Sequence, residues 1–182
     1  MSDRLAEDVV AWRELTDPSS ITPAAAPVSL VRIVPTALTA VQEHLSRDRM
    51  TEHIGLLFGQ VELAADTSPV VTILIAHPLD AAFASSTHVV MQRDDWPSAW
   101  RRLSSRGFDQ QQLVGWYHSH PGHSIFLSTT DLQTQALWFR QPWHVALVFD
   151  PVSLDLGAFC GSQGRRTPML ILDEDTRSFT GL

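Results

Sequence analysis

The residues best suited to chemistry lie in one run of fourteen, His118-Ser-His-Pro-Gly-His-Ser-Ile-Phe-Leu-Ser-Thr-Thr-Asp131. The run contains two histidines two positions apart, His118 and His120, and a carboxylate at Asp131. Two imidazoles and one carboxylate are a ligand set typical of catalytic zinc, which keeps its fourth position open. The run therefore indicates a metal centre that holds one Zn2+ ion per chain.

The expected secondary structure brings these three side chains together. Residues 113–120 are typical of a β-strand, and side chains two apart on a strand project from the same face. Both imidazoles can therefore reach one ion, and Pro121-Gly122 then ends the strand. Asp131 falls near the start of a helix predicted over residues 130–140, from which its carboxylate can turn back toward the histidines.

Each of these residues also has a plainer interpretation. A His-x-His pair occurs often without a metal. Asp131 can be a first-turn acid that favours the helix dipole, and Ser128 can be the N-cap of a Ser-x-x-Asp capping box. Glu52, which precedes an apolar strand containing Gly55 and Gly59, can be a solvated turn residue. The occurrence of all these features together favours the metal site over the separate explanations.

The other histidines are weaker candidates. His123 lies inside the motif loop and is expected to be a loop or substrate contact. The rest are expected to be packing or surface residues: His44, His53, His77, His88 and His144.

The remaining sequence predicts an α+β layered domain. Strands are expected at residues 28–34, 54–63, 70–76, 89–91, 144–149, 156–159 and 169–172, and further helices at 36–47 and 95–106. Residues 1–27, which include a Pro/Ser/Ala-rich stretch, are expected to be an N-terminal extension and linker. Residues 28–173 form the predicted domain, and residues 174–182 form a polar C-terminal tail.

Composition excludes several classes of partner. The net charge of −7 argues against a nucleic acid or an anionic membrane surface, which require a basic face. No apolar stretch approaches the roughly 20 residues that span a bilayer. Cys160 is the only cysteine, which excludes an internal disulfide and a thiolate metal site, and the N-terminus lacks the apolar core of a signal peptide. A cytoplasmic protein is expected.

The basic residues are all arginine, and the chain contains neither lysine nor asparagine. A GC-rich genome explains both absences, because lysine and asparagine use AT-rich codons. The alternative is that a protein working beside a lysine-modifying system avoids offering an acceptor amine. The second idea does not explain the missing asparagine.

With Glu52 and Ser128 included, the pattern resembles the JAMM (MPN-plus, Mov34-type) metalloprotease family. The segment Val114-Gly-Trp-Tyr-His-Ser-His-Pro-Gly122 is close to the form in eukaryotic deubiquitinating members, and Phe149-Asp-Pro-Val152 matches the strand after the motif helix. The resemblance covers about residues 28–172. It implies a single-domain MPN (deaminase-like) α/β sandwich with a central mixed β-sheet flanked by helices. It also implies zinc-dependent hydrolysis of the bond after the C-terminal glycine of a ubiquitin-like protein.

Carried onto this sequence, the resemblance implies zinc ligands at His118, His120 and Asp131, a general base at Glu52, and an oxyanion donor at Ser128. The short connections fit a compact prokaryotic-type member. The expected partner is therefore a bacterial ubiquitin-like protein or its conjugate, with E1- and E2-like conjugation enzymes as further partners. Two interpretations stay open beside this one: a protease for a sulfur-carrier or phage protein, and a non-catalytic MPN scaffold.

Overall fold

The structure is a computed structural model that describes residues 27–63, 68–79 and 112–173. The expected N-terminal extension up to residue 26, the strand at 89–91, the helix at 95–106 and the polar tail all lie outside the described residues. In the described ranges, neither helix has the length or the apolar run that a bilayer crossing requires.

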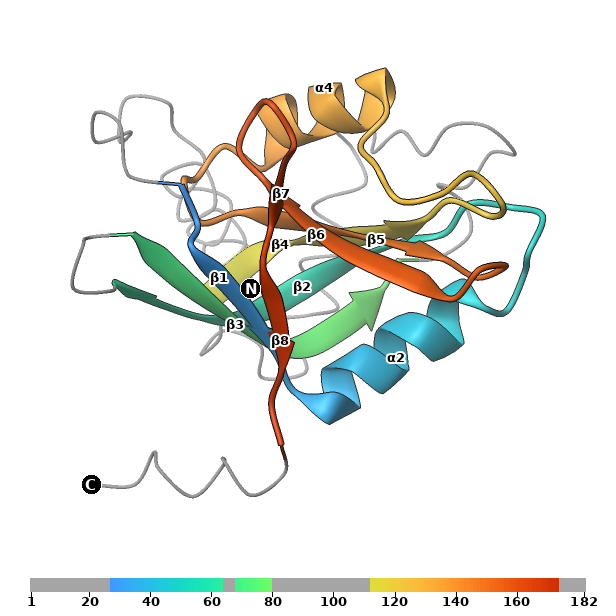
Figure 1. Ribbon diagram of the computed structural model, residues 1–182, viewed down its shortest axis with the longest axis horizontal. Helices are drawn as coiled ribbons and strands as arrows, with labels where there is room; N and C mark the ends of the chain where they lie inside the picture. Colours follow the sequence, from blue (N-terminus) through green and yellow to red (C-terminus); the bar gives the residue numbers. More distant parts are fainter. Residues whose placement is uncertain (1–26, 64–67, 80–111, 174–182) are drawn as a thin grey trace, which may run out of the picture.

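The described elements confirm the predicted α+β class (Figure 1). In chain order they are β1 (Leu30–Ile33), α2 (Pro35–Leu45), β2 (Ile54–Leu63), β3 (Pro69–Pro78), β4 (Gln112–Ser119), α4 (Thr129–Trp138), β5 (Val145–Asp150), β6 (Asp155–Cys160), β7 (Arg165–Thr167) and β8 (Met169–Ile171). The predicted ends differ from these by at most two residues. One strand was not predicted: residues 165–167 form β7, which pairs with β6.

The eight strands of the described residues form one mixed sheet in the order β7-β6-β5-β4-β2-β3-β1-β8. The two outermost strands, β7 and β8, follow each other in the chain with only Pro168 between them. Figure 1 shows them as one continuous red ribbon that leaves one edge of the sheet and joins the other. The backbone N–H of Val31 donates to the Pro168 carbonyl at 2.9 Å. The sheet is therefore strongly curled, because its two edges share one stretch of chain.

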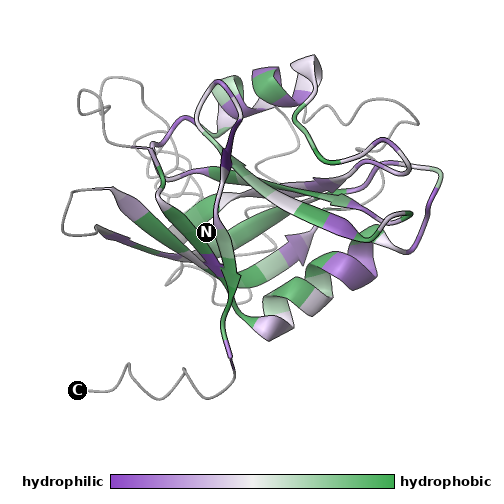
Figure 2. Cartoon of the chain, viewed as in Figure 1, coloured by the Kyte–Doolittle hydropathy of each residue, from purple (hydrophilic) through white to green (hydrophobic). Residues whose placement is uncertain are grey.

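The two helices cover different faces of this sheet (Figure 1). Helix α2 begins at Pro35, which is favourable in the first helical turn, and buries Ala37, Val41 and Leu45. These side chains join one apolar cluster with Tyr117 of β4. A second cluster contains Trp116 together with Phe139, which follows α4. Figure 2 shows the strands as mostly hydrophobic and both helices as two-sided.

Strand β4 is the element that positions the site. It pairs antiparallel with β2 and parallel with β5, so both its edges are occupied. Its side chains alternate between the faces, with Trp116 in the cluster on the α4 side and Tyr117 in the cluster on the α2 side. The polar residues at the end of β4 are therefore held by a fully paired, buried strand.

Candidate metal centre

The structure brings His118, His120 and Asp131 into one buried group. The Nε2 atoms of the two histidines lie 3.1 Å apart. Asp131 Oδ1 lies 3.3 Å from His118 Nε2, and Asp131 Oδ2 lies 3.2 Å from His120 Nε2. The side chains come from the end of β4 and the first turn of α4, as the alternation and the helix start predicted. Within the described ranges this is the only group of three such side chains that could hold a metal ion.

The donor atoms fit a zinc ion in both chemistry and spacing. Tetrahedral zinc, with bonds of about 2.0–2.1 Å, separates its ligand atoms by roughly 3.3–3.4 Å, close to the distances that join the three side chains here. The exposed fractions of His118, His120 and Asp131 are 0%, 3% and 7%. A buried carboxylate facing two imidazole nitrogens is costly without a compensating positive charge. A cation at their centre would contact all three side chains at once.

The electrostatics of the group are dominated by the Asp131 carboxylate. Burial by itself raises the pKa of Asp131, but the hydrogen bonds with His118 and His120 outweigh it and hold that pKa well below its usual range. Burial lowers the pKa of His120, yet the hydrogen bond and charge of Asp131 outweigh it and leave that pKa raised. The carboxylate is therefore strongly anionic, as a metal ligand must be.

Ser128 is the N-cap of α4 and completes a capping box with Asp131. The Ser128 Oγ accepts from the Asp131 N–H at 3.2 Å, and the Ser128 N–H donates to Asp131 Oδ2 at 2.7 Å. The plainer interpretation of this pair is thus confirmed, and it coexists with the metal group. The capping box fixes the Asp131 side chain because one carboxylate oxygen serves both the helix end and His120.

Glu52 lies just before β2, at the end of the sheet where β4 delivers its histidines. Ile54 is paired with His118, and the antiparallel register continues through Ser119, whose N–H donates to the His53 carbonyl at 3.1 Å. The His53 N–H in turn donates to Ser119 Oγ at 3.0 Å. The charge of Glu52 contributes to the raised pKa of His120. Glu52 is therefore within electrostatic reach of the metal group and half-buried.

Asp150 is a residue of the site region to which the sequence analysis gave no role. Its carboxylate accepts from the backbone N–H groups of Gly122 at 2.9 Å, Val152 at 2.8 Å and Ser124 at 3.3 Å. Burial raises the pKa of Asp150, but these bonds outweigh it and lower that pKa. Ser124 has a positive φ of 69°, an unfavourable backbone conformation for a residue other than glycine. The hydrogen bonds to Asp150 stabilise the loop after His120 in this conformation. The family-like segment Phe149-Asp-Pro contains Asp150 and was the sequence feature that could have indicated this role.

Other predicted candidates lie apart from the metal group. His123 is exposed, as expected of a loop residue, and is not among the three side chains that could hold a metal. His44 and His144 are buried packing residues, also as expected. Cys160 is buried at the end of β6, where the Thr167 hydroxyl lies 3.1 Å from its sulfur.

Comparison with known proteins gives the same family as the motif. A family model described as JAB1/Mov34/MPN/PAD-1 ubiquitin protease matches residues 26–141. COP9 signalosome complex subunit 5 of Caenorhabditis elegans is 30% identical over 137 residues, which cover 71% of this chain and 36% of that protein. The same subunit of Drosophila melanogaster is 30% identical over 141 residues, covering 76% and 42%. The chain thus spans less than half the length of these relatives.

A solved structure supports the fold alone. The solution structure of protein DSY2949 from Desulfitobacterium hafniense matches with a TM-score of 0.58 and 18% sequence identity. The match covers 79% of this chain and 94% of that one.

Proposed function

Since the chain belongs to the JAB1/Mov34/MPN/PAD-1 ubiquitin protease family, we propose that it is a zinc-dependent peptidase or isopeptidase. Its substrate is the bond after the C-terminal glycine of a ubiquitin-like protein, in a conjugate or a precursor. The observation that carries the proposal is the convergence of His118, His120 and Asp131 within electrostatic reach of Glu52. The domain is assigned to residues 28–173.

The three ligands would hold the ion through two neutral nitrogens and one anionic oxygen. When bound, zinc supplies a Lewis acid that polarises a carbonyl and makes water more acidic. Glu52 is the general base: its carboxylate takes the proton of the attacking water and delivers it to the departing nitrogen. This role requires a carboxylate next to the ligands but outside their set, and the position of Glu52 just before β2, where its charge acts on His120, supports it.

Ser128 is proposed as the donor to the substrate oxygen that becomes negative during attack. Its Oγ uses a lone pair to accept from the Asp131 N–H, and its own O–H can donate to the substrate. Because the capping box fixes Ser128 at the helix start, this donor is held in place before substrate arrives. Donors of this kind contribute because they are oriented in advance.

The class of substrate rests on the family description, which names a ubiquitin protease. The cellular setting is proposed as a bacterial ubiquitin-like conjugation or immunity system in the cytoplasm, served by E1- and E2-like enzymes. The lack of lysine and asparagine, which fits a GC-rich bacterial genome, supports that setting. The hydrolytic chemistry also rests on the family description, and nothing is carried over from the COP9 signalosome subunits, since the chain spans less than half their length.

The test pairs zinc content with cleavage of a fusion to the ubiquitin-like protein encoded beside this gene. Wild type, Glu52→Gln and the control Glu43→Gln, which alters an exposed carboxylate on α2, are compared. We expect one zinc per chain in all three, and a loss of cleavage rate of about 10²–10⁴-fold only in Glu52→Gln. Zinc without cleavage in any of them would contradict the proposed substrate. A folded protein without zinc would contradict the metal site itself.

A further inference from the structure

Within the described part of the chain, His118 has no hydrogen bond of the kind that usually orients a metal-binding histidine. Metal-binding histidines almost always donate their second ring N–H to a carboxylate, carbonyl or water, which fixes the ring plane. Here the Nδ1 atom of His118 is buried and has no hydrogen-bond partner among the described residues. Among the described residues, the plane of the His118 ring is therefore fixed by contacts other than a hydrogen bond at Nδ1.

The contact that fixes it is an aromatic stack. The rings of Trp116 and His118 lie with centroids 4.4 Å apart and planes inclined by only 9°. The Trp116 ring also stacks on Phe139, at 5.5 Å and 13°. Trp116 is 1% exposed and His118 is fully buried, so neither ring can turn without disturbing the packing.

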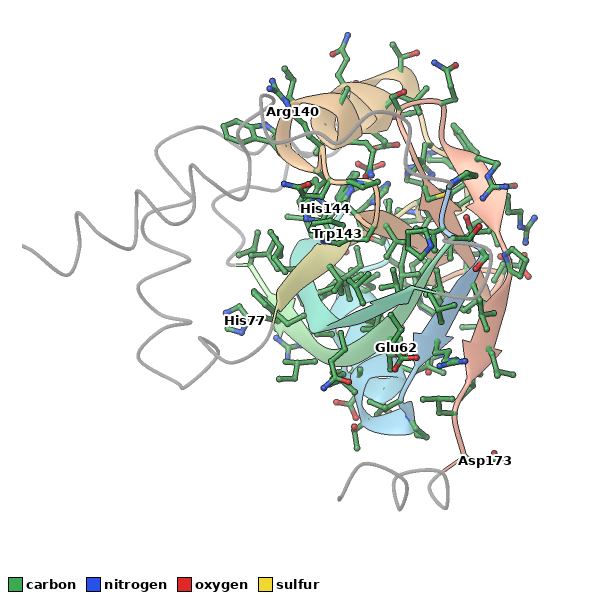
Figure 3. All side chains as sticks on the ribbon, turned by 90° about the vertical axis from the view of Figure 1, so that its left-hand side faces the viewer. Glu62, His77, Arg140, Trp143, His144 and Asp173 are labelled. Carbon is green, nitrogen blue, oxygen red and sulfur yellow. The ribbon has the colours of Figure 1, made fainter. Side chains whose placement is uncertain are left out.

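The Trp116 indole is itself held by one side chain of α4. Its Nε1–H donates to Gln135 Oε1 at 2.7 Å. The Gln135 amide nitrogen donates to the carbonyls of His144 at 3.1 Å and Phe139 at 3.4 Å. All three bonds fix the amide in one orientation, because a flipped amide would place its N–H groups against the indole N–H. Figure 3 shows His144 and Trp143 close together below the end of α4 that leads to Arg140.

Gln135 lies four residues after Asp131, so both project from the same face of α4. Asp131 supplies the carboxylate of the metal group. Gln135 accepts the hydrogen bond from Trp116 of β4, the strand that supplies the imidazoles. The hydrogen bond from Trp116 to Gln135 therefore sets the distance between α4 and β4 at the level of the metal group. An error there would move Asp131 relative to both histidines.

We propose that Trp116 and Gln135 are positioning residues for the metal site: Gln135 locks the Trp116 indole, and the indole fixes the ring plane of His118. This inference rests on the proposed zinc site and adds to it the residues that preorganise two of its ligands. Neither residue touches the ion or the substrate, so their effect is on metal affinity and on the geometry of the ligands.

The test measures zinc affinity by competition with a chromophoric chelator, and the visible spectrum of the cobalt-substituted protein. Gln135→Leu keeps the volume but removes the hydrogen bonds; Trp116→Phe keeps a ring against His118 but loses the N–H. We expect each variant to weaken zinc binding about tenfold and to alter the cobalt spectrum. This is the low end of the loss of affinity that follows when a residue supporting a metal ligand is removed. The double variant should bind zinc no more weakly than the worse single variant, because both act through one bond.

Val41→Ala is the control for simple loss of stability. It opens the buried core beneath α2, on the other side of the sheet, and should lower the melting temperature without changing zinc affinity. Folded variants of Trp116 and Gln135 that bind zinc as tightly as wild type would overturn the inference. Wild type without zinc would instead overturn the metal site. If Gln135→Leu does not fold, the milder Trp116→Phe decides the question alone.

Discussion

Buried histidines lie on both faces of strand β4, and their hydrogen-bond partners differ between the two faces. On the α4 side, His118 and His120 face the carboxylate of Asp131, which raises the pKa of His120 in spite of its burial. On the α2 side, buried His44 faces the hydroxyl of Tyr117, with 3.0 Å between Nδ1 and the hydroxyl oxygen. Burial and the positive charge of His53 lower the pKa of His44 to about 4.

The difference shows what makes a buried histidine suitable as a metal ligand. Both environments remove imidazoles from water, but only one places an anion beside them. A carboxylate makes the group as a whole attractive to a cation, whereas a phenol satisfies one nitrogen and leaves the histidine neutral. The α4 side is thus prepared for a metal ion, and the α2 side is prepared for packing.

The largest expected effect comes from removing the anion that distinguishes the two faces. Asp131→Asn should weaken zinc binding by more than roughly 100-fold, because an anionic ligand becomes a neutral amide. Loss of a residue that only supports a ligand costs roughly 10–100-fold in metal affinity. The measurement is a competition titration on the folded protein. Addition of EDTA should lower the melting temperature of wild type but not of this variant.

Two control variants sharpen this prediction. Asp155→Asn changes an exposed carboxylate on β6, and His44→Gln changes the histidine of the α2 side. Both should bind zinc with wild-type affinity. If His44→Gln weakened zinc binding as much as Asp131→Asn, the functional difference between the faces would not exist.

The second prediction concerns acid stability of the zinc-free protein. The pKa of His44 is about 4 in the folded state and near 6.5 in the unfolded state, so the unfolded state binds more protons between these values. The contribution of His44 is complete above pH 6.5 and is lost as pH falls toward 4. Its slope is up to about 1.4 kcal/mol per pH unit in the free energy of unfolding. Urea unfolding with EDTA at several pH values measures it.

Comparison with His44→Gln isolates this contribution from the other groups that titrate. Buried His144, whose pKa burial also lowers to about 4, acts with the same sign and remains in both proteins. The raised pKa of His120 acts in the opposite sense, adding stability at low pH. The difference in unfolding free energy between wild type and His44→Gln should shrink as pH falls from 6.5 to 4. A constant difference would refute the assignment.

The sequence was sufficient to predict that His118, His120 and Asp131 lie together and which elements carry them. The spacing of His118 and His120 on a strand, and the Ser-x-x-Asp start of α4, are local patterns, and local patterns persist in the fold. The ends of the strands differed because pairing partners, not propensity, decide where strands stop. Strand β7 escaped prediction because its three residues, Arg165 to Thr167, show no apolar run and form a strand only through pairing with β6.

The supporting contacts could not be predicted because they join distant parts of the chain. Trp116 and Tyr117 are both buried in the core. Their polar atoms, however, bond to partners 19 and 73 residues away. Residue type shows that an indole N–H needs an acceptor, but only the tertiary structure shows that Gln135 supplies it. The same holds for the three backbone groups bound by Asp150.

A third prediction tests how tightly the α2 side is packed. A Cβ atom at Gly55 would overlap the ring of Tyr117, which lies across the glycine on the paired strand. Gly55→Ala should therefore lower the free energy of unfolding by about 2–3 kcal/mol, measured by urea unfolding. Gly161→Ala is the comparison: its added Cβ meets nothing within 4 Å, so only its positive φ opposes the change. A smaller loss at Gly55 than at Gly161 would show that the Tyr117 ring moves freely.

The smallest expected effect comes from removing the hydrogen bond between Tyr117 and His44 while keeping the packing of the ring on the α2 side. Tyr117→Phe keeps the ring but leaves the buried Nδ1 of His44 without its partner, which should cost about 1–2 kcal/mol of unfolding free energy. Zinc affinity should stay within about twofold of wild type, since no ligand is touched. Adding His44→Leu removes the orphaned nitrogen as well, and should recover part of the loss, because replacing both polar partners costs less than replacing one. If the double variant is less stable than Tyr117→Phe, the pair contributes through its packing and not through its hydrogen bond.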